Sequence, residues 1–88
     1  MVETKVTITD PVGLHARPAA QFVQIAARYK SAVKINGNNK SANAKSMLAV
    51  MGLGLGSGAE ITISADGEDE NECLAALKAF VESNFAEG

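Results

Sequence analysis

The only histidine of the 88-residue chain, His15, lies in a segment whose residue types suit phosphate chemistry, Gly13-Leu14-His15-Ala16-Arg17-Pro18-Ala19-Ala20. The segment passes from a turn into a predicted helix, where the first backbone N–H groups have no partner within the helix. The positive end of a helix favours an anion and disfavours an imidazolium, so we expect a neutral ring near pH 7 that can attack phosphorus. The N–H groups of Ala16 and Arg17 and the Arg17 guanidinium would then bind the phosphoryl oxygens.

A surface histidine that merely flanks a helix, with Arg17 as a solvated charge, is the simpler interpretation, and the helix start alone does not decide between the two. A shallow, exposed site would suit a carrier, because the N–P bond must break again when the group is passed on. A small enzyme such as a phosphohydrolase is the weaker hypothesis, since neither a positioned general base nor a metal cluster accompanies His15 in the sequence. Of the two active roles, a covalently modified carrier that is not an enzyme fits these residues better, and the plain surface histidine stays open on them alone.

Hydrophobic periodicity predicts seven elements in the order β-α-β-β-α-β-α. The expected strands cover residues 2–9, 32–36, 40–44 and 60–65, and the expected helices cover residues 17–29, residues 46–51 and a last segment that Asp69 opens. We expect an α+β fold, an open-faced β-sandwich, in which a four-stranded antiparallel sheet has the helices on one face and water on the other. The length suffices for one core, so residues 1–88 are expected to form a single domain.

Local signals mark the connections between these elements. Asn36-Gly37-Asn38-Asn39 is a strong hairpin signal. Asp69-x-x-Glu72 resembles a capping box at the start of the last helix. A flexible connection is expected around Gly54, Gly56 and Gly58. The buried stripe of the last helix is expected to comprise Leu74, Leu77, Val81 and Phe85, flanked by Cys73 and Phe80.

Composition and charge exclude several classes of function. Eight basic and ten acidic residues give a formal net charge of -2, which argues against a nucleic-acid-binding protein and against a polybasic anchor for a membrane surface. No stretch approaches the roughly 20 apolar residues of a transmembrane helix, and residues 1–5 do not open a signal peptide. The single cysteine cannot form an intrachain disulfide. We expect a cytoplasmic monomer that binds neither nucleic acid nor membranes.

Three motifs that suggest a cofactor or a metal have simpler explanations. Residues 54–59, Gly-Leu-Gly-Ser-Gly-Ala, match a dinucleotide-binding pattern, but they follow a helix and precede a strand, the reverse of what such a site requires. Cys73 lacks further cysteine or histidine partners for a metal cluster. The acidic run at residues 66–70 lacks the ligand spacing of an EF-hand and suits a solvated turn before a helix. We expect no cofactor and no metal site.

Residues 13–18, Gly-Leu-His-Ala-Arg-Pro, resemble the active-site signature of the histidine-containing phosphocarrier family of the bacterial phosphoenolpyruvate-dependent sugar phosphotransferase system. The resemblance extends over nearly the whole chain, including Ala44-Lys45-Ser46 before the short helix and the run at residues 58–65, Gly-Ala-Glu-Ile-Thr-Ile-Ser-Ala. It implies that the histidine matching His15 is phosphorylated on Nδ1 by enzyme I and passes the group to the sugar-specific A components of the permeases. It also implies that the arginine matching Arg17 assists the transfer.

Ser46 has two interpretations. It is a good N-cap for the short apolar helix, and enteric-type members of the family keep a serine there that is not a switch. The resemblance to low-GC Gram-positive members implies instead phosphorylation by an ATP-dependent kinase, which would change the charge of a docking surface. Met47-Leu48-Ala49 departs from the Ile-Met-Gly common after that serine, and Ala20 stands where many of those members have threonine. Regulation at Ser46 stays open on the sequence.

The resemblance also implies a surface beside His15 on which partner proteins dock. The expected docking residues are Ala20, Gln24, Met47, Leu48 and Met51. The last three lie on a helix too short to bury every side, so they are either core residues or an exposed apolar patch with adaptable methionine contacts. A purely regulatory module that signals through Ser46 to a transcriptional regulator is a second hypothesis, but the best-known regulatory paralogue lacks the histidine. A carrier of the nitrogen branch stays open.

Overall fold

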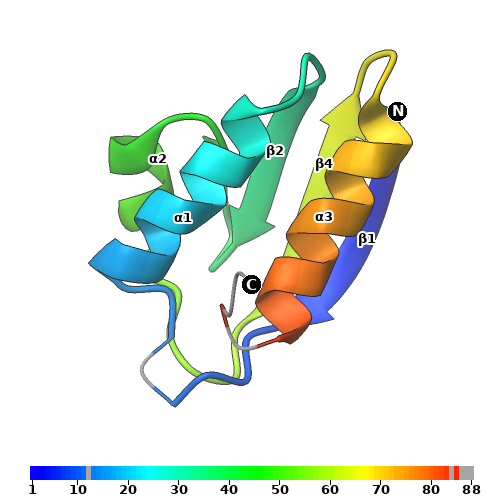
Figure 1. The fold of residues 1–88 in the computed structure, drawn as a ribbon. Coiled ribbons are helices and arrows are strands. Elements are labelled where there is room, and N and C mark those ends of the chain that lie inside the picture. The colour runs from blue at the N-terminus through cyan, green and yellow to red at the C-terminus, as the bar shows by residue number, and fades with distance from the viewer. Residues whose placement is uncertain (12, 84, 86–88) are drawn as a thin grey trace.

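Seven elements follow one another in the order expected from the sequence (Figure 1). The structure, a computed structural model, describes residues 1–11, 13–83 and 85. The strands are β1 (Val2–Thr7), β2 (Ala32–Gly37), β3 (Lys40–Asn43) and β4 (Glu60–Asp66), and the helices are α1 (Ala16–Ala27), α2 (Met47–Met51) and α3 (Glu70–Glu82). The observed boundaries lie within two residues of the predicted ones. No helix among these residues is long and apolar enough to cross a membrane.

The four strands form one antiparallel sheet in the order β1-β4-β2-β3. In the centre, Ile63 of β4 pairs with Thr4 of β1 on one side and with Ile35 of β2 on the other. Figure 1 shows α1 and α3 over the same face of the sheet, with α2 beside α1. The predicted open-faced β-sandwich is therefore confirmed.

The core lies between the sheet and the two long helices. Strand residues at a spacing of two point into it, and the predicted inward positions Val33, Ile35, Ile61, Ile63 and Ala65 are all buried. α3 buries Cys73, Leu77, Phe80 and Val81. The predicted stripe of α3 needs two corrections. Leu74 is only partly buried while Cys73 is fully buried, and Phe85 is buried but lies beyond the end of the helix at Glu82.

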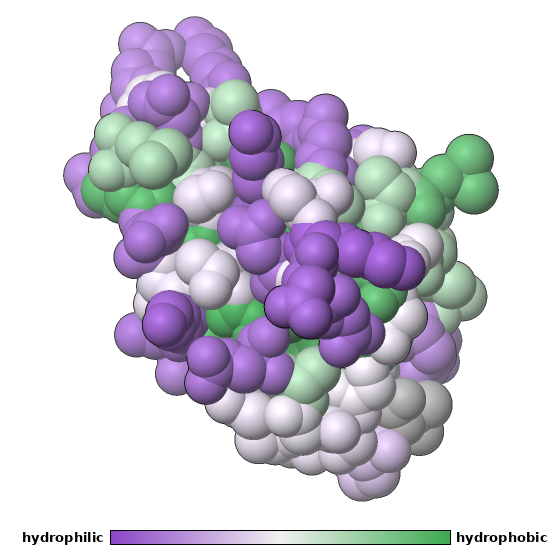
Figure 2. All heavy atoms as spheres, turned by 180° about the vertical axis from the view of Figure 1, so that it is seen from behind, coloured by the Kyte–Doolittle hydropathy of each residue, from purple (hydrophilic) through white to green (hydrophobic). Residues whose placement is uncertain are grey.

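The other face of the sheet carries polar side chains. Strand register aligns one row across the four strands, Glu3, Ser64, Lys34 and Asn43, and a second row, Lys5, Thr62, Asn36 and Ser41. Figure 2, turned by 180° from Figure 1, looks onto this face, and purple and pale residues cover most of it. The sheet thus has one face packed on the core and one face in water, as the alternation in its strands predicted.

The predicted capping box at the start of α3 is wrong, because the side chain of Asp69 binds a different loop. Its carboxylate accepts hydrogen bonds from the Lys30 N–H at 2.8 Å, from the Ser31 N–H at 3.0 Å and from the Ser31 hydroxyl. It makes no side-chain cap bond to α3. Glu70 instead turns back and accepts a hydrogen bond from the Gly67 N–H at 3.1 Å. The acidic turn therefore ties the loop between α1 and β2 to the start of α3.

These contacts predict that the stability of the fold depends on the ionisation of Asp69. Hydrogen bonds from the Ser31 hydroxyl and the Lys30 N–H hold the pKa of the Asp69 carboxyl below its usual value. A carboxyl with a lowered pKa in the folded chain stabilises fully above its unfolded-state pKa, and this contribution is lost as pH falls through the folded-state pKa. We expect the urea concentration at the midpoint of unfolding to decrease as the pH is lowered below about 4. Asp69→Asn should have a lower midpoint than wild type at pH 7 and a smaller decrease in acid.

Asp66→Asn is the matched control, because Asp66 is an exposed aspartate at the end of β4, three residues before Asp69, and lies 3.6 Å from the Met1 ammonium. It should keep the wild-type midpoint at pH 7 and the wild-type acid response. An Asp69→Asn variant with the full acid sensitivity of wild type would show that other carboxyls cause the effect.

Candidate functional site

His15 is the N-cap residue of α1, and its backbone is extended, with φ -90° and ψ -172°. Its carbonyl accepts the first helical hydrogen bond, from the Ala19 N–H at 2.9 Å, and its own N–H donates to the Gly13 carbonyl at 3.1 Å. The imidazole makes no cap bond to the helix, and the residue is exposed. The backbone of His15 is therefore fixed while its ring faces solvent.

The start of α1 presents two backbone donors next to this ring. The N–H groups of Ala16 and Arg17 donate to no other residue of the described chain, Pro18 has no N–H, and the Ala19 N–H is bonded to His15. The first turn contains no acidic residue. The Arg17 side chain is exposed and forms no ion pair with a described carboxylate. The ring thus lies at the positive end of a helix whose first turn also carries an exposed arginine, an arrangement that suits an anion.

The glycine-rich loop after α2 holds the segment that precedes His15. The Leu14 N–H donates to the Leu55 carbonyl at 2.9 Å, and both leucine side chains are buried. Gly13 has a φ of +84°, and a Cβ there would lie 2.6 Å from Gly56 Cα. The two backbones therefore touch, and Gly13 meets both a conformational and a steric requirement for glycine.

The expectation of a flexible connection at residues 54–58 is corrected by these contacts. Leu53 and Leu55 are buried in the core, so the segment between α2 and β4 is fixed at two points. The sequence contains a signal of this anchoring, because leucines alternate with glycines over residues 52–56. The supporting role of Leu14 and Leu55 has no such signal, since it depends on a contact between segments about 40 residues apart.

Ser46 is the N-cap of α2, as predicted, and its Oγ accepts a hydrogen bond from the Ala49 N–H at 3.4 Å. Beyond it, the three docking candidates of α2 fall into two groups. Met47 is partly buried and packs against the core. Leu48 is 87% exposed and Met51 is 39% exposed. The short helix therefore combines the two interpretations, with one core contact and an exposed apolar patch formed by Leu48 and Met51.

The two docking candidates of α1 lie on its outward side. Ala20 is partly buried and Gln24 is exposed. Both share a face with Arg17, because Ala20 follows it by three positions and Gln24 by seven. α2 packs against α1 (Figure 1). The structure therefore places the predicted docking residues on two adjacent helices, the first of which begins at His15, with Met47 turned partly into the core.

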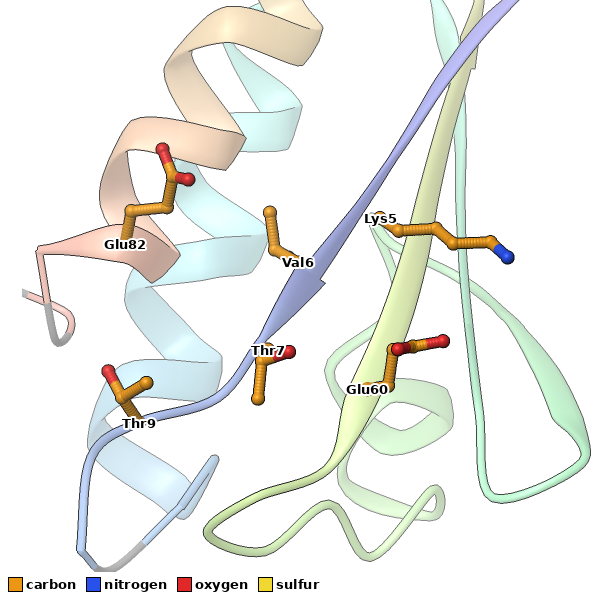
Figure 3. A pocket seen from close by; sticks show the side chains of 6 residues that line it. All are labelled: Lys5, Val6, Thr7, Thr9, Glu60 and Glu82. Carbon is orange, nitrogen blue, oxygen red and sulfur yellow. The ribbon is translucent and has the colours of Figure 1, made fainter.

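Other features of the described residues lie away from His15. Figure 3 shows a hollow of about 440 Å³ at the edge of β1, lined by Lys5, Val6, Thr7, Thr9, Glu60 and Glu82. Lys5 and Glu60 point to the open face of the sheet there, and Glu82 comes from the end of α3.

Burial raises the pKa of the Cys73 thiol, which lies in the core. No group of three His, Cys, Asp or Glu side chains able to hold a metal occurs among the described residues.

Known proteins resemble this chain both in sequence and in structure. A family model described as "PTS HPr component phosphorylation site" matches residues 2–83. The phosphocarrier protein HPr of Cupriavidus necator is 40% identical over 88 residues, which cover 100% of this chain and 99% of that protein. HPr-C-His from Thermoanaerobacter tengcongensis superposes with a TM-score of 0.94 at 43% identity, covering 100% of this chain and 99% of the other. Bacillus subtilis Crh, a catabolite repression protein described as an intertwined, swapped dimer, gives a TM-score of 0.76 at 44% identity, covering 99% and 100%.

The fold and the family match together define a small phosphocarrier, a protein that holds a phosphoryl group in transit and is not a catalyst. The chain belongs to the histidine-containing phosphocarrier (HPr) family of the bacterial phosphotransferase system. Its relatives include both phosphocarriers named HPr and the related protein Crh.

The contact between Gly13 and Gly56 predicts a large difference between two glycine-to-alanine substitutions. Gly13→Ala adds a Cβ that overlaps Gly56 and forces a positive φ, so we expect a loss of about 2 kcal/mol or more in the free energy of unfolding. Gly56→Ala adds a Cβ with nothing within 4 Å, so its effect should stay within about 0.5 kcal/mol. Urea unfolding followed by circular dichroism measures both. Equal losses would contradict the backbone contact.

Proposed function

We propose that His15 is the residue that carries the phosphoryl group, and that the chain takes this group from phosphorylated enzyme I and donates it to the sugar-specific A components of permeases during sugar uptake. The observation that carries the proposal is the exposed imidazole at the N-cap of α1, next to the N–H groups of Ala16 and Arg17, which donate to no described residue. Membership of a phosphocarrier family supports it.

The proposed chemistry is an exchange of one bond to phosphorus for another. The Nδ1 lone pair of His15 forms the N–P bond while the bond between phosphorus and the donor breaks, and its electron pair stays with the donor. Transfer to the acceptor breaks the N–P bond in the same way and restores the neutral ring. The helix end and Arg17 offset only part of the phosphoryl charge. Partial compensation suits a carrier, because the group is held and can still leave.

The exposed residues of α1 and α2 are proposed to dock both partners in turn. Leu48 and Met51 supply apolar area, and Ala20 and Gln24 connect this patch to Arg17 along α1. One surface serves the donor and the acceptor because each must bring its own reacting group to the same ring. Side-chain flexibility at methionine favours contact with partners of different shape.

Regulation at Ser46 by an ATP-dependent kinase, with a transcriptional regulator as a further partner, is a second proposal. The observation that favours it is the position of Ser46 at the start of the helix that carries the exposed Leu48 and Met51, two and five residues further on. A phosphate there would place a dianion on the apolar docking surface. The similarity to Crh, whose name refers to catabolite repression, supports the same idea.

We further propose that the chain acts as a cytoplasmic monomer. The described open face of the sheet is polar (Figure 2), so it offers little apolar area for self-association. The swapped dimer described for Crh shows that a similar sequence also permits a dimer.

Alanine substitutions at His15 and Ser46 separate the two proposed modifications. With phosphoenolpyruvate and catalytic enzyme I, wild type and Ser46→Ala should each gain one acid-labile phosphoryl group, and His15→Ala should gain none. With ATP and the serine kinase, wild type and His15→Ala should gain one acid-stable phosphoryl group, and Ser46→Ala none. Intact mass and phosphorus NMR measure both. An acid-labile phosphoryl group that persists in His15→Ala would overturn the assignment of the carrier residue.

Substitution of Leu48 tests the docking surface without touching the reacting ring. Leu48→Ser removes an apolar side chain that is 87% exposed, so folding stability should change by less than about 0.5 kcal/mol. We expect the KM of enzyme I for this protein to rise about five- to tenfold, with kcat little changed, because contact area is lost on docking.

Ala75→Ser on the exposed side of α3 serves as the control and should leave both kinetic constants unchanged. Equal KM values for Leu48→Ser and wild type would remove Leu48 from the docking surface.

A further inference from the structure

The turn between β2 and β3 lies against the loop that supports His15. The register pairs Gly37 with Lys40, so Asn38 and Asn39 form a two-residue turn. Both have positive φ, 51° and 61°, the geometry of a type I′ hairpin, in which asparagine and glycine are favoured. A Cβ at Gly37 would lie 2.5 Å from Leu55 Cδ2. The end of the hairpin and the loop after α2 are therefore in direct contact.

The two asparagines of this turn differ in what their side chains bind. The Asn38 Nδ2 donates to the Leu53 carbonyl at 2.8 Å and to the Gly54 carbonyl at 3.1 Å. For Asn39, no side-chain hydrogen bond to a described residue is found. Backbone conformation alone would accept glycine at either position. The carboxamide of Asn38 therefore has a second use, which is to hold two successive carbonyls of the loop.

The same loop continues directly into the contact with the His15 segment. The Leu55 carbonyl, one residue beyond Gly54, accepts the hydrogen bond from the Leu14 N–H at 2.9 Å. Leu14 immediately precedes His15, whose carbonyl begins α1. One continuous stretch, residues 53–55, thus binds Asn38 on one side and Leu14 on the other.

We infer that Asn38 is a positioning residue for His15: its carboxamide fixes residues 53–54 so that the Leu55 carbonyl holds Leu14 and keeps the ring at the N-cap of α1. This inference rests on the proposed role of His15. Asn38 does not touch the ring or the phosphoryl group. Its effect is on how firmly the ring is placed beside the N–H groups of Ala16 and Arg17. Because the helix-end effect falls off within one turn, a small displacement of the ring weakens the stabilisation of the phosphoryl group.

Asn38→Gly and Asn39→Gly form a matched pair that tests this inference. Both place glycine at a positive φ in the same turn, so the hairpin conformation is kept, and only Asn38→Gly removes the two hydrogen bonds. Amide hydrogen exchange by NMR gives the first readout. The Leu14 N–H should exchange about three- to tenfold faster in Asn38→Gly than in Asn39→Gly, the effect of one lost hydrogen bond. The Ile63 N–H in the central strand should exchange equally in both.

The second readout is phosphotransfer from enzyme I. Asn38→Gly should lower the rate of phosphorylation about three- to tenfold relative to Asn39→Gly, the range expected from one hydrogen bond, with the KM unchanged. Asn38→Asp should resemble Asn38→Gly, because a carboxylate cannot donate to the two carbonyls. Equal Leu14 exchange in the two glycine variants, or equal phosphotransfer in both, would overturn the inference. If wild type itself accepts no phosphoryl group, the proposed function fails, and the exchange of Leu14 still tests the contact by itself.

Discussion

The backbone contact between residues 13–14 and 55–56 is the constraint on which the site depends. An anion at a helix start benefits from the partial positive charge only within the first turn, so a ring that is to carry one there must be positioned closely. α1 fixes one side of His15 through its carbonyl, and the hydrogen bond from Leu14 to Leu55 fixes the other. Because the His15 side chain makes no cap bond of its own, the chain positions it through the backbone, and the imidazole stays available for the proposed transfer.

The two ends of α1 differ in whether the protein supplies hydrogen-bond partners for the polar groups there. Near its C-terminal end, the Lys45 ammonium donates to the Tyr29 carbonyl at 2.8 Å, and Asp69 holds both Lys30 and Ser31. Polar groups at that end are satisfied within the protein. At the N-terminal end the donors of Ala16 and Arg17 are left without a described partner. A phosphoryl group is the kind of ligand that such an end binds. The hydrogen bonds to other segments are therefore made at the C-terminal end of α1, and the donors at its N-terminal end stay available for a ligand.

The proposed docking surface shows a similar division within a single short helix. Val50 is buried and Met47 packs on the core, so α2 is held in place by two side chains. Leu48 and Met51 remain exposed because a helix of five residues cannot turn every side chain inward. Exposed apolar side chains on the helical side, and a polar sheet on the other, give the molecule one side suited to protein contacts.

The sequence by itself determined the element order, the inward faces of β2 and β4, a hairpin within residues 36–39, and the position of His15 at a helix start, because these follow from local periodicity and turn chemistry. Membership of the phosphocarrier family was also evident in residues 13–18. Only the tertiary structure decided the partners of side chains from distant segments. Asp69 appeared to be a helix cap in sequence, yet it binds Ser31, and residues 54–58 appeared to be a loose linker, yet Leu55 supports the site. Such choices depend on which loops the sheet brings together, and no pattern within a short stretch of sequence contains that information.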